Sequence, residues 1–195
     1  AYIKREYRFC QHNILNDVSG TVELVLKLSD SGCICVMLNT VSAAQAVYSS
    51  LKDKVNTDTK LLLFHARFTA RRRKEIEGEC IDLFGKNTET KRPEKAVLVC
   101  TQVVEQSLDV DFDTMITEIA PIDLLLQRSG RVFRHENTVR PPEFKSPIIH
   151  VLVPQGGGYG GTGSVYEPYL LDKTRKYLNE TSKIRVPEQM REAIE

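Results

Sequence analysis

The chain has 195 residues, 41% of them hydrophobic, and its 27 basic side chains nearly balance 26 acidic ones to a formal net charge of +1. A chain of this length and composition can bury the core of one α/β domain. The near-neutral charge excludes nucleic-acid binding through an overall basic surface, so any such surface has to be local. Two basic clusters qualify, at residues 67–74 and 128–140.

The cysteines indicate the compartment. Five cysteines, an odd number, in a chain without a signal-like apolar N-terminus indicate reduced thiols in a cytoplasm. Cys33 and Cys35 are one residue apart within an apolar run and the four histidines are scattered, so we expect no bound metal. No stretch approaches 18 consecutive apolar residues, and we therefore expect no membrane partner.

The chain opens with an expected extended lead-in over residues 1–10 and a helix over residues 17–29, both assigned to the domain that follows. From Gly32, unbroken apolar runs alternate with segments of helical periodicity. The expected strands are residues 33–38, 60–64, 95–100, 114–119 and 148–153. The expected helices between them are residues 42–54, 69–84 and 122–133. This alternation predicts an α/β fold, a parallel sheet with helices on both faces.

Polar residues that follow the expected strands are the first candidates for a site, because ligands of such sheets bind beyond the carboxyl ends of the strands. These residues are Asn39, Thr40, the segment 65–68, Thr101, Gln102 and the loop at Ala120. Each has a simpler alternative: Thr40 is a good helix N-cap, and a histidine at a strand end is more often structural than catalytic.

A second candidate is the stretch Gln127-Arg128-Ser129-Gly130-Arg131-Val132-Phe133-Arg134-His135. In a helix, at about 100° per residue, Gln127, Arg131 and Arg134 fall within roughly 60° of one another. Guanidinium groups bind phosphate oxygens in pairs and stabilise the charge of phosphoryl transfer, so this face is expected to hold a polyphosphate. Gly130 inside the helix indicates a close approach of backbone or ligand.

This stretch resembles the last motif of superfamily-two helicases, Q-R-x-G-R-x-x-R. Residues 99–113, VCTQVVEQSLDVDFD, resemble the preceding motif of that superfamily in the form carried by the helicase-nuclease of type I CRISPR interference. The linker APIDLLL at residues 120–126 and the pair Arg134-His135 resemble the same family, so the likeness covers residues 97–135 almost continuously. The resemblance implies a RecA-like parallel sheet and the second motor domain of a helicase.

The resemblance also implies roles for single residues. Gln127, Arg131 and Arg134 would be catalytic and bind the nucleotide, reaching the γ-phosphate of an ATP that the missing first RecA-like domain holds with Mg²⁺. Asp109 would lie near the ribose or relay between two sites, with Glu105 and Gln106 lining the same cleft. The residues expected to contact nucleic acid are Asn39, Thr40, His65, Arg67, Arg73, Thr101 and Gln102.

Two local interpretations stay open. The family pattern places an acidic residue before the helix arginine, but Arg72 occupies that position here, so either Arg72 or Arg73 is the phosphate-contacting residue. The acidic trio Asp109, Asp111 and Asp113 is read as a solvated turn or, more weakly, a metal cluster.

Several motifs are missing from the sequence. The only Gly-Lys pair, at residues 85–86, lacks the remaining residues of a phosphate-binding loop, and there is neither an Asp-Glu nor a His-Asp dipeptide. We therefore expect the chain to be inactive alone and to act as the second motor domain of an ATP-dependent single-stranded DNA translocase. Its expected partners are single-stranded DNA, the missing first RecA-like and nuclease domains, and a CRISPR RNA-guided surveillance complex. The alternatives are another superfamily-two helicase or a stand-alone nucleic-acid-binding module.

The predicted domain plan gives residues 31–155 to the RecA-like domain, with residues 1–30 belonging to it. Residues 156–164 are expected to form a mobile glycine-rich loop. Residues 165–195 are expected to form a C-terminal helix over 165–179 and the start of a following region. Tyrosines of that helix either stack on bases or, as we favour, pack onto the domain.

Overall fold

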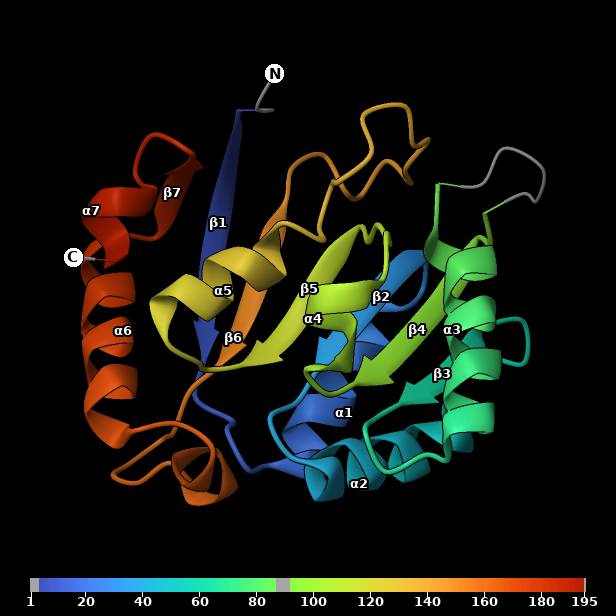
Figure 1. Ribbon diagram of the computed structural model, residues 1–195, viewed down its shortest axis with the longest axis horizontal. Helices are drawn as coiled ribbons and strands as arrows, with labels where there is room; N and C mark the ends of the chain where they lie inside the picture. The colour runs from blue at the N-terminus through green and yellow to red at the C-terminus, as the bar shows by residue number, and fades with distance from the viewer. Residues whose placement is uncertain (1–3, 87–91, 195) are drawn as a thin grey trace.

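The computed structural model describes residues 4–86 and 92–194, apart from the side chains of residues 106 and 107. Expectations for residues 1–3, for Glu195 and for the Gln106 side chain therefore lie outside the described residues. The strands form one sheet in the order β3-β4-β2-β5-β6-β1-β7 (Figure 1). Their bounds are β1 Arg5–His12, β2 Gly32–Met37, β3 Lys60–Phe64, β4 Lys95–Cys100, β5 Thr114–Glu118, β6 Ile148–Leu152 and β7 Lys183–Val186.

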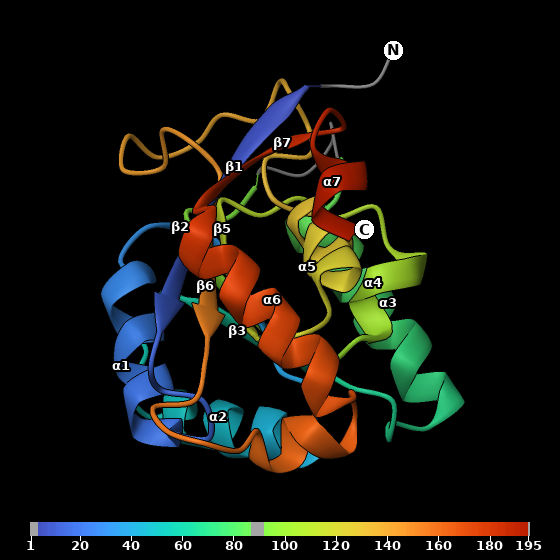
Figure 2. The same cartoon turned by 90° about the vertical axis from the view of Figure 1, so that its left-hand side faces the viewer.

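The sheet is parallel from β3 through β1, and only β7 runs antiparallel, against β1. Helices α1 (Val18–Leu28) and α2 (Val41–Lys52) cover one face. Helices α3 (Ala70–Phe84), α4 (Val103–Ser107) and α5 (Ile122–Ser129) cover the other, as Figure 2 shows. This arrangement confirms the predicted α/β class and the parallel sheet with helices on both faces.

The central strand β2 shows why unbroken apolar runs predicted the sheet. Every residue of Gly32–Met37 is buried, because β2 lies between β4 and β5 and has helices above and below. Burying a side chain such as Ile34 contributes roughly 1.5–3 kcal/mol relative to leaving it exposed. A strand buried on both faces has no polar alternation, which is the pattern that the sequence shows.

The end of α5 corrects the prediction of a helix over residues 122–133. The helix ends at Ser129, and Gly130 is its C-cap residue. Beyond it, Val132 forms a parallel bridge with Phe112, and Phe133 has a φ of 54°, a left-handed conformation that no helix continues through. The chain turns because this bridge and the buried Val132 draw it onto the segment that leads into β5.

The C-terminal part also differs from the sequence interpretation. Within the glycine-rich segment, Gly160–Ser164 is the 3-10 helix η1, and its Thr162 is buried rather than in an open loop. Helix α6 (Pro168–Glu180) lies close to its expected position, and α7 (Met190–Ile194) contacts α5. Strand β7 went unpredicted because four residues, Lys-Ile-Arg-Val, carry too little alternation to stand out.

All five cysteines are free, as the sequence led us to expect. Burial raises the pKa of the Cys33 and Cys80 thiols to about 12, which keeps both in the unreactive protonated form. Within residues 4–86 and 92–194, no helix has the length and apolar character needed to cross a bilayer.

Candidate nucleotide-facing arginines and nucleic-acid edge

The polar residues chosen from strand ends meet at one edge of the sheet. Strands β3, β4 and β2 are neighbours, so the segments after them lie side by side at their carboxyl ends. The Thr101 amide donates to the Phe64 carbonyl at 3.1 Å, and Gln102 Nε2 donates to the Asn39 carbonyl at 3.1 Å. The structure therefore brings together residues that lie far apart in the sequence. We call the surface formed by Asn39, Thr40, residues 65–68, Thr101 and Gln102 the carboxyl edge.

Asn39 and Thr40 both have internal hydrogen-bond partners. Asn39 is buried: its amide N–H donates to Glu118 Oε2 at 2.6 Å, and its side chain bonds Arg128, Ile119 and Thr162. Thr40 caps α2, because its hydroxyl accepts the Ala43 amide at 3.2 Å. The capping alternative is thus observed for Thr40, and the buried Asn39 side chain shapes the edge from inside.

His65 has the geometry of a positioning residue. It is buried, its ring stacks on Phe68 with centroids 4.2 Å apart, and its Nδ1 accepts the Arg67 amide at 3.3 Å. Burial, more than the nearby Arg67 charge, lowers the pKa of the imidazole. The neutral ring therefore holds the turn that presents Arg67, whose side chain is exposed.

The structure distinguishes the two arginines whose register was open. Arg72 forms ion pairs with Glu75 at 3.2 Å and Glu79 at 3.1 Å along α3, and the hydrogen bond to Glu75 is the main reason its pKa is raised. Arg73 is half-buried with a buried, partnerless Nε, and no carboxylate of the described residues pairs with its guanidinium, whose terminal nitrogens are therefore not committed to an ion pair. Arg73 is therefore the better candidate for a phosphate contact.

The predicted common helix face of Gln127, Arg131 and Arg134 does not form. Gln127 is exposed on α5, whereas both arginines lie beyond the end of that helix. Arg131 Nη1 and Nη2 donate to the carbonyls of Leu108 and Glu105, the latter at 2.6 Å. Arg131 is thus bound to main-chain acceptors in and just after α4, and burial lowers its pKa more than the neighbouring Arg134 charge does.

Arg134 is held differently. Its Nε donates to Asp109, which also receives His135 Nε2 at 3.2 Å, and its amide donates to Asp111 at 2.8 Å. The hydrogen bond from Arg134 is the main reason that the Asp109 pKa is lowered. Within the described ranges, Nη1 makes one long bond of 3.5 Å and Nη2 none, so both terminal nitrogens can take phosphate oxygens.

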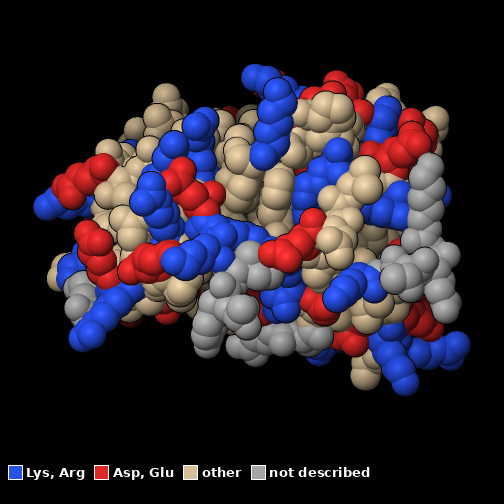
Figure 3. All heavy atoms as spheres, turned by 90° about the horizontal axis from the view of Figure 1, so that it is seen from above, with Lys and Arg blue, Asp and Glu red and all other residues tan. Residues whose placement is uncertain are grey.

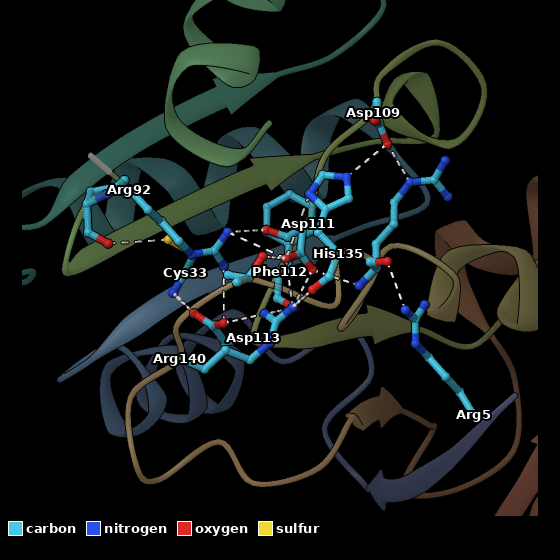
Figure 4. A network of polar contacts seen from close by, with 12 residues as sticks. Arg5, Cys33, Arg92, Asp109, Asp111, Phe112, Asp113, His135 and Arg140 are labelled. Carbon is cyan, nitrogen blue, oxygen red and sulfur yellow. Dashed lines mark hydrogen bonds and ion pairs between the residues drawn. The ribbon is translucent and has the colours of Figure 1, made fainter. Parts of the chain in front are cut away.

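Asp111 and Asp113 correct the interpretation of the acidic trio as a solvated turn. Both are fully buried and lie between Arg92 and Arg140, as Figure 4 shows. Arg140 Nη2 donates to both carboxylate oxygens of Asp111, at 2.8 and 2.7 Å, and Nη1 donates to Asp113. Arg134 pairs likewise with Asp109, so all three carboxylates of the trio are ion-pair partners.

The buried Asp111 also controls the path of the arginine stretch. It accepts the Arg134 amide and the Thr138 hydroxyl, the latter at 2.7 Å, while Asp113 accepts the Cys33 amide at 2.7 Å. The two carboxylates thereby tie the segment after α5 to the start of β2. This pairing explains how Arg134 keeps a defined position outside any helix.

Arg128 is the functional candidate that sequence reasoning passed over. It is 0% exposed, and its five N–H groups donate to five acceptors. These acceptors are Glu105 Oε1 at 2.7 Å, Thr117 Oγ1 at 2.8 Å, the Glu118 carbonyl at 3.2 Å, Asn39 Oδ1 at 3.0 Å and the Tyr166 hydroxyl at 3.0 Å. Arg128 stands four residues after Leu124 and three after Leu125, so it shares the apolar face of α5. This spacing was the signal in the sequence that could have identified Arg128 as a buried residue.

A hollow of about 1070 Å³ lies at the opposite edge, where β2 and β4 begin. Lys95, Arg92 and Arg140 line it together with Asp113 and Glu94. Figure 3 shows basic and acidic side chains intermingled over this edge, without a patch of one sign. The charge pattern here is not that of a phosphate-backbone track.

The fold is that of a RecA-like domain. The C-terminal domain of the DEAD-box protein Dbp5 shares the fold with a TM-score of 0.51 at 14% identity, over 92% of this chain and 87% of that one. Residues 30–137 match the family model described as the CRISPR-associated nuclease/helicase Cas3, C-terminal. The chain belongs to this family, as a helicase C-terminal domain, which confirms the resemblance seen in the sequence.

Comparisons with individual relatives lead to the same family. The CRISPR-associated endonuclease/helicase Cas3 of Escherichia coli is 41% identical over 172 residues, 88% of this chain and 19% of that protein. Cas3 of Thermus thermophilus is 44% identical over 146 residues, 73% of this chain and 16% of that protein. The crystal structure of T. fusca Cas3 superposes with a TM-score of 0.92 at 33% identity, covering this whole chain and 24% of that one. The chain thus spans about a fifth of the curated relatives it matches.

Proposed function

We propose that this chain is the second motor domain of an ATP-dependent single-stranded DNA translocase of CRISPR interference. The observation that carries the proposal is the geometry of Arg134, which an ion pair to Asp109 holds by Nε while its terminal nitrogens keep their phosphate-binding capacity. An arginine supplied across a domain interface accelerates phosphoryl transfer roughly 10³- to 10⁵-fold in related enzymes.

Relatives support ATP as the nucleotide. Structures described as T. fusca Cas3-ATP and T. fusca Cas3-AMPPNP both match this chain with a TM-score of 0.89, at 35% and 34% identity. In our proposal a first RecA-like domain holds ATP and Mg²⁺, since the sequence lacks the phosphate-binding loop. Asp109, Gln127, Arg131 and Arg134 of this chain complete the site from the other side.

The two arginines would act in different ways. Arg134 can reach the γ-phosphate without losing its contact to Asp109, because that contact uses Nε alone. Arg131 would first have to release the Leu108 and Glu105 carbonyls, so it becomes available only if α4 or its own side chain moves. We therefore infer that Arg134 engages the nucleotide first and that Arg131 follows as the domains close.

The carboxyl edge would carry the DNA strand. Arg67 and Arg73 would bind backbone phosphates, and the turns that begin at Asn39 and Thr101 would follow the strand through Thr40, Gln102 and main-chain groups. His65 would act by holding the Arg67 turn. Closure on ATP and opening after hydrolysis would move this edge relative to that of the first domain, which advances the protein along DNA.

The same proposal assigns the larger assembly. A chain of the complex described as a CRISPR RNA-guided surveillance complex, pre-nicking, matches this domain with a TM-score of 0.77 at 35% identity. Relatives named endonuclease/helicase support a nuclease domain elsewhere in the full-length protein. The surveillance complex, the nuclease domain and the first RecA-like domain are therefore the proposed partners.

The experiment that tests the proposal is ATP turnover by the purified chain and by the full-length protein, each with and without single-stranded DNA. We expect no turnover above background from the chain alone and DNA-stimulated turnover from the full-length protein. DNA-stimulated turnover by the chain alone that Arg131→Ala removes would overturn the composite site.

A further inference from the structure

The buried Arg128 side chain joins segments that serve different surfaces of the domain. Its acceptors come from the segment after β2, from α4, from the end of β5 and from the segment after η1. No N–H of this guanidinium lacks an acceptor, and none of its surface is exposed. A charge held this way resists displacement, because each lost bond would leave a buried polar group without a partner.

One side of this centre leads to the carboxyl edge. Asn39 accepts from Arg128 through Oδ1, and its carbonyl accepts from Gln102 at 3.1 Å. The Tyr166 hydroxyl accepts from Arg128 at 3.0 Å and from Gln102 at 3.3 Å. Gln102 is thus tied to the buried arginine twice, once through Asn39 and once through Tyr166.

The other side leads to the nucleotide-facing arginines. Glu105 pairs with Arg128 through its carboxylate and accepts Arg131 Nη2 through its carbonyl at 2.6 Å. Glu105 also lies one turn after Gln102, and its amide donates to the Gln102 carbonyl at 3.0 Å. A shift of the short helix α4 therefore moves the acceptor of Arg131 and the Gln102 backbone together.

We propose that Arg128, with Asn39, Tyr166, Gln102 and Glu105, forms a relay by which DNA on the carboxyl edge releases Arg131 toward the nucleotide. The relay rests on the function proposed above and adds its regulation. Arg128, Glu105 and Tyr166 are positioning residues, since they act through Arg131 and Gln102. DNA that draws Gln102 outward loosens its bonds to Asn39 and Tyr166, shifts α4 and frees the Arg131 guanidinium.

The chemistry of the relay explains why it responds as a unit. Its members share acceptors in a water-poor interior, where hydrogen bonds are stronger and an unmade one is more costly. Thr162 extends the unit, because its hydroxyl accepts from Asn39 and donates to Glu118, both at 3.1 Å. The ordered η1 segment thereby fixes Asn39 from the far side.

The sharpest test is Tyr166→Phe in the full-length protein, which removes one hydroxyl shared by Arg128 and Gln102. The measured quantity is the ratio of ATP turnover with saturating single-stranded oligothymidylate to turnover without it. We expect this ratio to fall about five-fold, the lower end of usual coupling between sites, with DNA affinity within about two-fold. The ratio does not depend on the folded fraction, so loss of folded protein alone leaves it unchanged.

Tyr159→Phe is the matched control. That hydroxyl, seven residues before Tyr166, donates to Asp172 at 2.6 Å, and among the described residues it makes no hydrogen bond to a member of the relay, so the ratio should stay unchanged. Thr162→Val is a second variant that tests the relay from the Asn39 side, with a smaller fall expected. An unchanged ratio in both Tyr166→Phe and Thr162→Val, or an equal fall in Tyr159→Phe, would overturn the relay. Wild-type turnover without DNA stimulation would instead overturn the proposed function, and the relay with it.

Discussion

Arg128 and Arg134 are six residues apart in one stretch, yet the fold uses them in opposite ways. Arg128 is completely buried with every N–H bonded, whereas the Arg134 side chain is 40% exposed and pairs with an Asp109 that is 59% exposed. The first arrangement commits the guanidinium to the protein, and the second keeps two nitrogens available for a ligand. Burial and the number of partners, rather than residue type, therefore separate a structural arginine from one that can take a ligand.

The contrast has an energetic side. An exposed ion pair contributes roughly 0–1 kcal/mol, because water screens it. Removing one partner of a buried pair costs about 3–5 kcal/mol, since the other charge is left uncompensated. Substitution of Arg128 should therefore lower the free energy of unfolding more than substitution of Arg134 does. For ATP turnover we expect the reverse order.

The largest effect is expected on turnover. Arg134→Ala in the full-length protein should lower ATP turnover about 10³-fold or more, because the developing phosphate charge loses its partner, with ATP affinity within a few-fold. Arg131→Ala should have a similar effect. Steady-state hydrolysis and nucleotide titration measure both quantities, and Arg72→Ala, an exposed arginine paired along α3, is the control. An equal loss of affinity and rate would contradict a transition-state role.

The reverse order should hold for stability. Arg128→Leu should lower the free energy of unfolding by about 3–5 kcal/mol, because Glu105 remains as a buried charge without its partner. Urea unfolding measures the change, and Arg134→Ala should cost less than about 1 kcal/mol. Replacing Glu105 by Leu as well should recover part of the loss. If Arg128→Leu lowered the free energy of unfolding only as much as Arg134→Ala does, the contrast between the two arginines would be contradicted.

The half-buried His150 should make the stability of the domain depend on pH. Burial is the main cause that lowers the pKa of His150 to about 4, and its Nδ1 lies 2.9 Å from His12 Nε2. The unfolded chain binds this proton below a pH of about 6.5, while the folded chain resists it until about 4. Stability should therefore fall as the pH drops from about 6.5 to 4, by at most about 3 kcal/mol from this group.

Urea unfolding at several pH values checks this dependence. His150→Gln removes the titrating group, and the fall over the same pH range should become shallower by the His150 share. A slope unchanged in this variant would assign the pH dependence to other groups.

The smallest effects are expected at the carboxyl edge. Arg67→Ala and Arg73→Ala should each weaken binding of single-stranded DNA a few-fold and reduce the salt slope of the affinity by about one. Fluorescence anisotropy at several salt concentrations measures both. Arg72→Ala should leave the slope unchanged, because Glu75 and Glu79 already pair with that side chain. Equal slopes in all three variants would make Arg67 and Arg73 ordinary solvated residues.

The meeting of the strand-end residues in the candidate site could be predicted from local sequence patterns. Thr40, His65, Thr101 and Gln102 each follow an apolar run, and parallel strands end at a common edge, so their meeting needed no tertiary knowledge. Arg131 and Arg134 stood out by their spacing in the motif. The end of α5 could not be predicted in the same way, because the bridge between Val132 and Phe112 joins segments 20 residues apart and overrides helical periodicity.

By itself, the sequence determined the class of fold, the family and the identity of the polar strand ends, because apolar periodicity and motif spacing are local properties of the chain. Only the tertiary structure decided which arginine is buried, which carboxylates are ion-pair partners and which amide of the edge faces inward. Arg128, Asp111 and Asn39 received these roles from partners 10 to 89 positions away, at Glu118, Arg140 and Arg128 among others. Burial and pairing depend on such distant contacts, which no local pattern records.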